Sequence, residues 1–178
     1  LPFLFMSYFN IAFAYRQAAS GGRGGADGVA GFAAAAAAAG SSGLILPDLP
    51  PEMVREGYKE ACGSAGLHPV YVVSPNTGRE RLEVIAEAGS GLLYATSRIG
   101  TTGKEMELEM RELTGFLSLA RETCGMPIAV GFSISRREQV ESLRGHADIA
   151  VVGTHFIRVW EEGGREGLKA ELKELTGA

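Results

Sequence analysis

The chain has 178 residues, of which 46% are hydrophobic and 21% are charged, and its formal net charge is −4. A chain of this length and balance can bury a sizeable core, so we expect a single domain over residues 1–178. No stretch approaches the roughly 20 apolar residues that a membrane span requires. The acidic balance and the scatter of lysine and arginine argue against a broad nucleic-acid-binding surface.

The chain opens on an apolar stretch, residues 1–15, that is hydrophobic enough for a signal peptide. It lacks a charged start, however, Asn10 interrupts it, and no clear cleavage site follows. A buried strand fits better, and because the first residue is Leu1 we expect a further segment upstream. Cys62 and Cys124 have no metal-type spacing, so we expect two buried thiols in a reducing cytoplasm.

Short apolar runs alternate with longer amphipathic segments along the chain. The runs predict strands at residues 1–7, 43–46, 69–73, 92–96, 128–130 and 149–152. The segments predict helices at residues 32–39, 52–64, 79–88, 107–122, 136–143, 154–162 and 165–175. This alternation indicates a parallel α/β sheet, either open and doubly wound or closed as a (β/α)8 barrel. A barrel usually needs about 200 residues or more, so this chain would lack the first two βα units.

Local signals mark several helix ends. Thr77 and Ser135 are each followed three residues later by a glutamate, which predicts two capping boxes, and Gly66 and Gly89 lie where helices should end. Residues 18–43 form a glycine- and alanine-rich region that we interpret as an insertion. Its seven alanines at 33–39 favour helix, whereas its Gly-Gly-Arg-Gly-Gly sequence is typical of a flexible loop. We assign this region no function.

Glycines and hydroxyl residues follow three successive predicted strands. The sequence SRIGTTG occupies residues 97–103, GFSIS occupies 131–135, and Gly153 and Thr154 follow the last strand. Glycine lets a backbone approach a ligand closely, and exposed N–H groups suit an anion. In barrels the loops after the last strands commonly hold a phosphate, and a helix starting at Thr154 would direct its free N–H groups at that phosphate. The alternative is that these glycines serve only tight turns.

Five motifs in register resemble the tryptophan synthase alpha subunit family. They are FMSYFN at 5–10, LILPDLP at 44–50, SRIGTTG at 97–103, VGFSIS at 130–135 and VGT at 152–154. The resemblance implies a (β/α)8 barrel that cleaves indole-3-glycerol phosphate into indole and glyceraldehyde 3-phosphate. It also implies an alpha2beta2 assembly in which pyridoxal phosphate belongs to the beta subunit, so we expect no cofactor in this chain.

The resemblance further assigns roles to individual residues. Backbone amides would hold the substrate phosphate at Gly103, Ser133, Gly153 and Thr154. The indole pocket would be lined by Met6, Tyr94 and Phe132, and Thr102 would lie on the closing loop. Asn10 and Asp48 would lie on the loop and partner side of the barrel. Two positions depart from the family, which usually has glycine where Ser133 stands and serine where Thr154 stands. A required positive φ would strain Ser133.

The family's acid/base residues are a glutamate on the first strand and an aspartate after the second. Both would precede Leu1, so we expect no catalytic residue in this chain, which alone should bind a phosphate ester weakly and cleave nothing. Asp48 is the only carboxylate that immediately follows a strand core, and a structural role, capping a helix or holding a loop, is the better interpretation. We expect no metal site, because none of the three histidines has a second ligand at metal spacing.

Two other functions stay open from the sequence. The chain could be a noncatalytic phosphate-binding partner of the beta subunit. It could also belong to another phosphate-binding barrel enzyme, such as an indole-glycerol-phosphate synthase or a thiamine-phosphate synthase. The combination of PDLP at 47–50 with RIGTTG at 98–103 argues against this last group.

Overall fold

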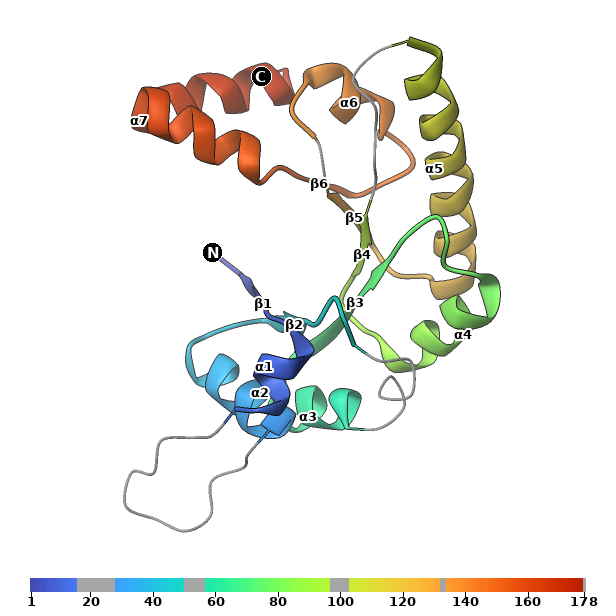
Figure 1. The fold of residues 1–178 in the computed structure, drawn as a ribbon, viewed down its shortest axis with the longest axis vertical. Helices are drawn as coiled ribbons and strands as arrows, with labels where there is room; N and C mark the ends of the chain where they lie inside the picture. The colour runs from blue at the N-terminus through green and yellow to red at the C-terminus, as the bar shows by residue number, and fades with distance from the viewer. Residues whose placement is uncertain (16–27, 50–56, 97–102, 132–133, 178) are drawn as a thin grey trace. The chain divides into compact units, whose positions relative to one another are not determined.

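The computed structural model describes residues 1–15, 28–49, 57–96, 103–131 and 134–177, with backbone alone for 103–108. The chain forms two compact units. Unit 1 comprises Leu1–Val72, Gly78–Leu93 and Thr123–Met126, and unit 2 comprises Val73–Thr77, Tyr94–Glu122 and Pro127–Ala178. Each unit is built from parallel strands followed by helices (Figure 1), as the alternating sequence pattern predicts.

The described residues of unit 1 contain three parallel strands in chain order. These are β1 (Leu4–Met6), β2 (Gly43–Ile45) and β3 (His68–Val73). Four helices accompany them: α1 (Phe9–Phe13), α2 (Gly28–Ala38), α3 (Tyr58–Ser64) and α4 (Arg79–Ala88). All three residues of β2 are buried, as expected for the middle strand of a parallel sheet. A Cβ at Gly43 would lie 2.6 Å from the carbonyl oxygen of His68, so the strands can approach this closely only with glycine there.

Tyr58 connects α3 to this sheet. Its side chain is 1% exposed, and its hydroxyl donates a hydrogen bond of 2.6 Å to the carbonyl of Leu44 on β2. Its ring packs edge-on against Tyr71 of β3, with the ring centres 5.3 Å apart. Burial, the main cause, raises the pKa of Tyr58 and raises that of the neighbouring Cys62 thiol to about 12. This cluster is therefore neutral and serves as core. Both Cys62 and Cys124 are free, as predicted, with Cys62 buried and Cys124 only partly so.

Unit 2 contains β4 (Leu93–Thr96), β5 (Ile128–Gly131) and β6 (Ile149–Val151), also in chain order. Its helices are α5 (Gly103–Cys124), α6 (Arg137–Ser142) and α7 (Thr154–Thr176). All four residues of β5 are buried. Helix α5 contributes an apolar stripe to the core, consisting of Leu113, Phe116, Leu117 and Ala120. Gly131 at the end of β5 is paired in register with Val151 of the parallel strand β6.

Several predicted boundaries need correction. Helix α5 begins at Gly103 rather than at residue 107, and the short helix α1 was not predicted. The capping box expected at Thr77 is wrong, because Gly78 caps α4 and the Thr77 hydroxyl accepts the N–H of Ser74 at 3.0 Å. The box expected at Ser135 is also wrong, since the helix starts one residue later and Gln139 is the capping side chain.

The two helices predicted at the end of the chain are confirmed as two halves of α7. Gly164 separates them with a non-helical backbone, φ 56° and ψ −145°. Gly66, at φ 70°, ends α3 as predicted, and Gly89 ends α4 with an extended backbone. Among the helices of the described residues, none has the length and apolar character needed to cross a membrane.

Candidate functional site

Tyr94, one of the residues expected to contact the substrate, is the second residue of β4. The Tyr94 side chain is half-buried, and this burial raises its pKa, so the ring is a neutral, mainly apolar surface. It lies directly over the backbone of Gly131 at the end of β5. A Cβ built on Gly131 would be 2.7 Å from the Tyr94 Cζ atom and closer still to the hydroxyl oxygen. Glycine at 131 therefore allows the Tyr94 ring to occupy this place.

Strand β6 leads directly into the first turn of α7. Gly153 is the N-cap of this helix, with φ −108° and ψ −93°, and Thr154 is its first residue. Both residues are exposed, and a Cβ at Gly153 would meet no described atom within 4 Å. The first N–H groups of an α-helix have no acceptor within the helix. This turn therefore presents free N–H donors and the positive end of a helix dipole to open space.

Gly103 has a similar position at the other long helix of unit 2. It is the first residue of α5, so its N–H is among the donors that the helix does not use internally. The sequence predicts Gly103 in a loop before the helix, whereas the backbone of α5 already starts there. Its predicted role as a phosphate donor is compatible with this position, because helix N-termini attract anions.

Asp148 lies at the amino end of β6, directly before its first residue, and holds the start of this strand in place. One of its oxygens, Oδ2, accepts the N–H of Ile128 and a guanidinium N–H of Arg121, each at 2.8 Å. The Ile128 hydrogen bond, more than Arg121, holds the pKa of Asp148 below its usual value. These contacts connect the last turn of α5 with the amino ends of β5 and β6, away from the glycine-bearing ends. Asp148 is therefore part of the scaffold.

Three predicted residues lie in unit 1. Met6, at the end of β1, is 51% exposed, and Asn10 lies on α1 with its side chain exposed. Asp48 follows β2, and its Oδ1 accepts the backbone N–H of Phe9 at 2.7 Å. This bond joins the loop after β2 to the first residue of α1, which is a structural role for Asp48. The predicted assignments of Thr102, Phe132 and Ser133 lie outside the described residues.

One contact beside the α7 turn has no signal in the sequence. His155 Nε2 lies 2.7 Å from Glu171 Oε1, although the two residues are 16 positions apart. They meet because the break at Gly164 folds the second half of α7 back along the first. Of the other histidines, His68 contacts the Ser90 hydroxyl at 2.9 Å. Within the described part of the chain, no group of three His, Cys, Asp or Glu residues could hold a metal ion.

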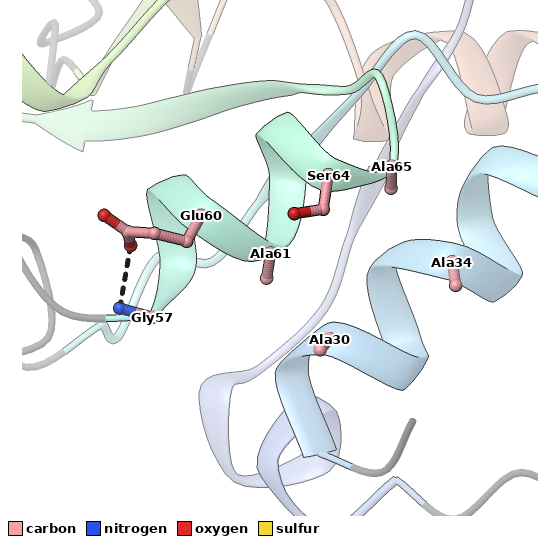
Figure 2. Close-up of a pocket in the computed structure, with 7 residues that line it drawn as sticks. All are labelled: Ala30, Ala34, Gly57, Glu60, Ala61, Ser64 and Ala65. Atoms are coloured by element: carbon pink, nitrogen blue, oxygen red, sulfur yellow. Dashed lines mark hydrogen bonds between the residues drawn. The ribbon is translucent and has the colours of Figure 1, made fainter. Parts of the chain in front are cut away.

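A hollow of about 360 Å³ lies elsewhere, between α2 and α3 of unit 1 (Figure 2). Small side chains make up most of its lining: Ala30, Ala34, Gly57, Glu60, Ala61, Ser64 and Ala65. Its one charged group, Glu60, already accepts the N–H of Gly57 at 3.0 Å. None of the predicted site residues lines this hollow, and its lining indicates no ligand.

Comparison with known proteins gives one consistent result. The family model described as "Tryptophan synthase alpha chain" matches residues 1–177. The tryptophan synthase alpha chain of Syntrophotalea carbinolica is 39% identical over 175 residues, which are 98% of this chain and 64% of that protein. That of Desulforapulum autotrophicum is 38% identical over 176 residues, 99% of this chain and 64% of that protein.

Solved structures agree with the sequence matches. A tryptophan synthase a2b2 complex from Pyrococcus furiosus contains a chain that is 35% identical, with a TM-score of 0.79 over 99% of this chain and 67% of that chain. A mutant alpha-subunit from the same organism gives 34% identity and a TM-score of 0.77. This similarity confirms the (β/α)8 barrel class rather than an open doubly wound sheet. The chain spans 64% of the length of the first two relatives.

Proposed function

The chain belongs to the tryptophan synthase alpha chain family, and we propose on that basis that it carries the phosphate-binding part of a lyase. The reaction is the aldolytic cleavage of indole-3-glycerol phosphate to indole and glyceraldehyde 3-phosphate, a step of tryptophan biosynthesis. We propose the cytoplasm as its location, which is compatible with the two free cysteines.

The first turn of α7 carries this proposal. A phosphate dianion needs several N–H donors and compensation of its charge, and a helix N-terminus supplies both. Gly153 and Thr154 are exposed, and the space in front of Gly153 is open among the described atoms. In this proposal their N–H groups hold the substrate phosphate, together with the N–H groups of Gly103 and Ser133. The N-terminus of α7, which follows strand β6, thus serves as the binding group.

Tyr94 is proposed to contact the indole ring. Its half-buried aromatic face can stack on or pack against another aromatic ring, and Gly131 leaves the space that keeps the Tyr94 ring in place. Met6 and Phe132 stay predicted as further indole contacts, and Thr102 as a residue of the closing loop. Each of these assignments rests on the family motifs at 5–10, 97–103 and 130–135.

We assign the proton transfers of the reaction to residues that do not belong to this sequence. Cleavage of a carbon–carbon bond of this kind needs a general acid and a general base. The glutamate and aspartate that the resemblance implies have no counterpart in residues 1–178, and Asp48 is occupied by the N–H of Phe9. We therefore expect this polypeptide, assayed alone, to bind a phosphate ester without cleaving it.

We also propose that unit 1 provides the face for the beta subunit, which would carry the pyridoxal phosphate. The solved relative is an a2b2 complex by its description. Around Asn10 and Asp48, helix α1 exposes large apolar side chains, with Ile11 53% and Phe13 65% exposed. Apolar and aromatic side chains on a protein surface are typical of the centre of a protein–protein interface.

The phosphate assignment can be tested by titrating the 178-residue chain with inorganic phosphate while the backbone amide signals are followed by NMR. We expect the amides of Gly153 and Thr154 to shift. The substitution Gly153→Asp places a carboxylate beside the bound anion and should raise Kd by about tenfold or more, equivalent to about 1.4 kcal/mol.

Gly115→Asp is the matched control, because Gly115 is exposed on α5 and a Cβ there meets no described atom within 4 Å. It adds the same charge and should leave Kd unchanged. An equal effect of both substitutions, or no phosphate binding by the wild-type chain, would contradict the proposed site. Formation of indole from indole-3-glycerol phosphate by the 178-residue chain alone would contradict the assignment of the proton transfers.

A further inference from the structure

Helix α7 is a helical hairpin whose two halves have different attachments. Gly164 breaks the helix, and the second half runs back along the first (Figure 1, red). The halves approach closely at Gly167, where a Cβ would lie 3.3 Å from the carbonyl oxygen of Val159. Across all of α7, which the structure describes completely, Leu175 is the one buried residue. The core therefore holds α7 most directly at Leu175, near the end of its second half.

The first turn of α7 is attached to the second half through one polar contact. His155 Nε2 and Glu171 Oε1 are 2.7 Å apart, and the two side chains are only 25% and 26% exposed. A carboxylate can only accept, so the imidazole must carry its hydrogen on Nε2 in this contact. Hydrogen bonds to an ionised carboxylate are short and stronger than neutral ones, and this distance is in their range.

His155 lies in the turn that is proposed to bind phosphate, so its contact with Glu171 affects that turn. His155 is the second residue of α7, directly after Thr154, and its own backbone N–H is one of the free donors of the first turn. Gly153 and Thr154 are exposed, so they receive little packing from the rest of the protein. The direction of all three N–H groups depends on how firmly this turn is held.

We propose that His155 is a positioning residue for the phosphate-binding turn, acting through Glu171. The bond fixes the first turn of α7 to the half that Leu175 anchors, so that the N–H groups of Gly153 and Thr154 are oriented before the anion arrives. This inference rests on the proposed function, since it assumes that the turn binds phosphate.

The test compares variants by their Kd for inorganic phosphate and by their melting temperature. His155→Ala removes the bond, and we expect Kd to rise about three- to tenfold, as the loss of one hydrogen bond allows. In His155→Gln the side-chain amide can still donate to Glu171, so Kd should stay within about twofold of wild type. Glu171→Ala should resemble His155→Ala, and the double substitution should add little to either, because both remove the same contact.

Lys169→Ala is the matched control, since it removes an exposed ion pair of the same helix, Lys169 with Glu166 at 2.8 Å, that does not touch the first turn. Its Kd should equal that of wild type. A lower melting temperature of His155→Ala with an unchanged Kd would overturn the positioning role and leave a structural one. His155→Gln binding as weakly as His155→Ala would overturn the route through Glu171. If the wild-type amides of Gly153 and Thr154 do not respond to phosphate, the proposed function fails, and this inference with it.

Discussion

Replacing Gly131 by alanine tests the contact that holds Tyr94. Gly131 is buried at the end of β5, and the added methyl group would lie 2.7 Å from Tyr94 Cζ and 3.3 Å from Cε1. Real Cβ atoms essentially never approach another heavy atom to less than 3.0 Å. The backbone of β5 is held by its neighbour β6, so the ring of Tyr94 must move.

The magnitude follows from the cost of inserting an extra methyl group into packed structure, about 1–3 kcal/mol. Tyr94 is half-buried, so it can turn outward, but it then loses contacts that it makes in place. For a chain of this size each kcal/mol lowers the melting temperature by roughly 2–4 °C, so we expect a decrease of about 2–12 °C.

The assay is thermal and urea unfolding of Gly131→Ala, of Tyr94→Leu, and of the double substitution. In the Tyr94→Leu background the methyl group no longer meets the distal ring atoms, so Gly131→Ala should cost less there by at least about 0.5 kcal/mol. Gly115→Ala is the control, because it fills open space in the interior of α5. This change should stabilise the protein by about 0.5–1 kcal/mol. Strictly additive effects of the substitutions at 94 and 131, or a stabilising Gly131→Ala, would refute the steric argument.

Two further substitutions probe the scaffold. Tyr58→Phe removes the hydroxyl that donates to the Leu44 carbonyl inside unit 1, and should lower the free energy of unfolding in urea by about 1–2 kcal/mol. Asp148→Asn should lower the melting temperature at pH 7, because Asp148 pairs with Ile128 N–H and Arg121 as a carboxylate. The pKa of Asp148 is depressed, so its stabilisation is present above the usual value near 3.8 and is lost as the pH falls further. The difference between Asp148→Asn and wild type should therefore close at acidic pH.

Each of these two predictions has a specific contrary result. Tyr8 is 63% exposed, so Tyr8→Phe should have almost no effect, and a loss equal to that of Tyr58→Phe would show that burial is not the cause. For Asp148, the side chain is 43% exposed and its ion pair is worth less than about 1 kcal/mol. A difference from wild type that stays constant between neutral and acidic pH would mean that the charge of Asp148 contributes nothing.

The regular elements could be predicted because their cause is local. Strand β5 lies within one residue of its predicted range, since a buried parallel strand is a short continuous apolar run. Strand β6 is equally close to its predicted range, although its residues are exposed or only partly buried. Helix α4 has the predicted bounds, 79–88, because its apolar residues repeat at helical spacing between two glycines. Helix α1 was missed for the opposite reason. It has five residues, and the hydrogen bond at its start comes from Asp48, 39 positions away.

In the candidate site, too, local features could be predicted from sequence and contacts between distant segments could not. The glycines after the strands and the helix start at Thr154 could be recognised from sequence, since their backbone effects are local. The need for glycine at position 131 could not be recognised from sequence, because it is imposed by the ring of Tyr94 on another strand. The contact between His155 and Glu171 was equally invisible, because it depends on the unusual backbone at Gly164. Contacts between distant segments require the fold itself.

The alanine-rich helix α2 has a thermodynamic consequence. Its buried residues are Val29, Gly31, Ala33 and Ala36, and Ala30 and Ala34 line the hollow beside α3 (Figure 2). Alanine has no side-chain rotamers to lose, so ordering α2 costs almost only backbone entropy. The same small side chains bury little apolar area, and therefore add little to the heat-capacity change of unfolding. The free energy that holds α2 in place should thus vary less with temperature than the free energy that holds α5, whose leucines and phenylalanine bury much more apolar area.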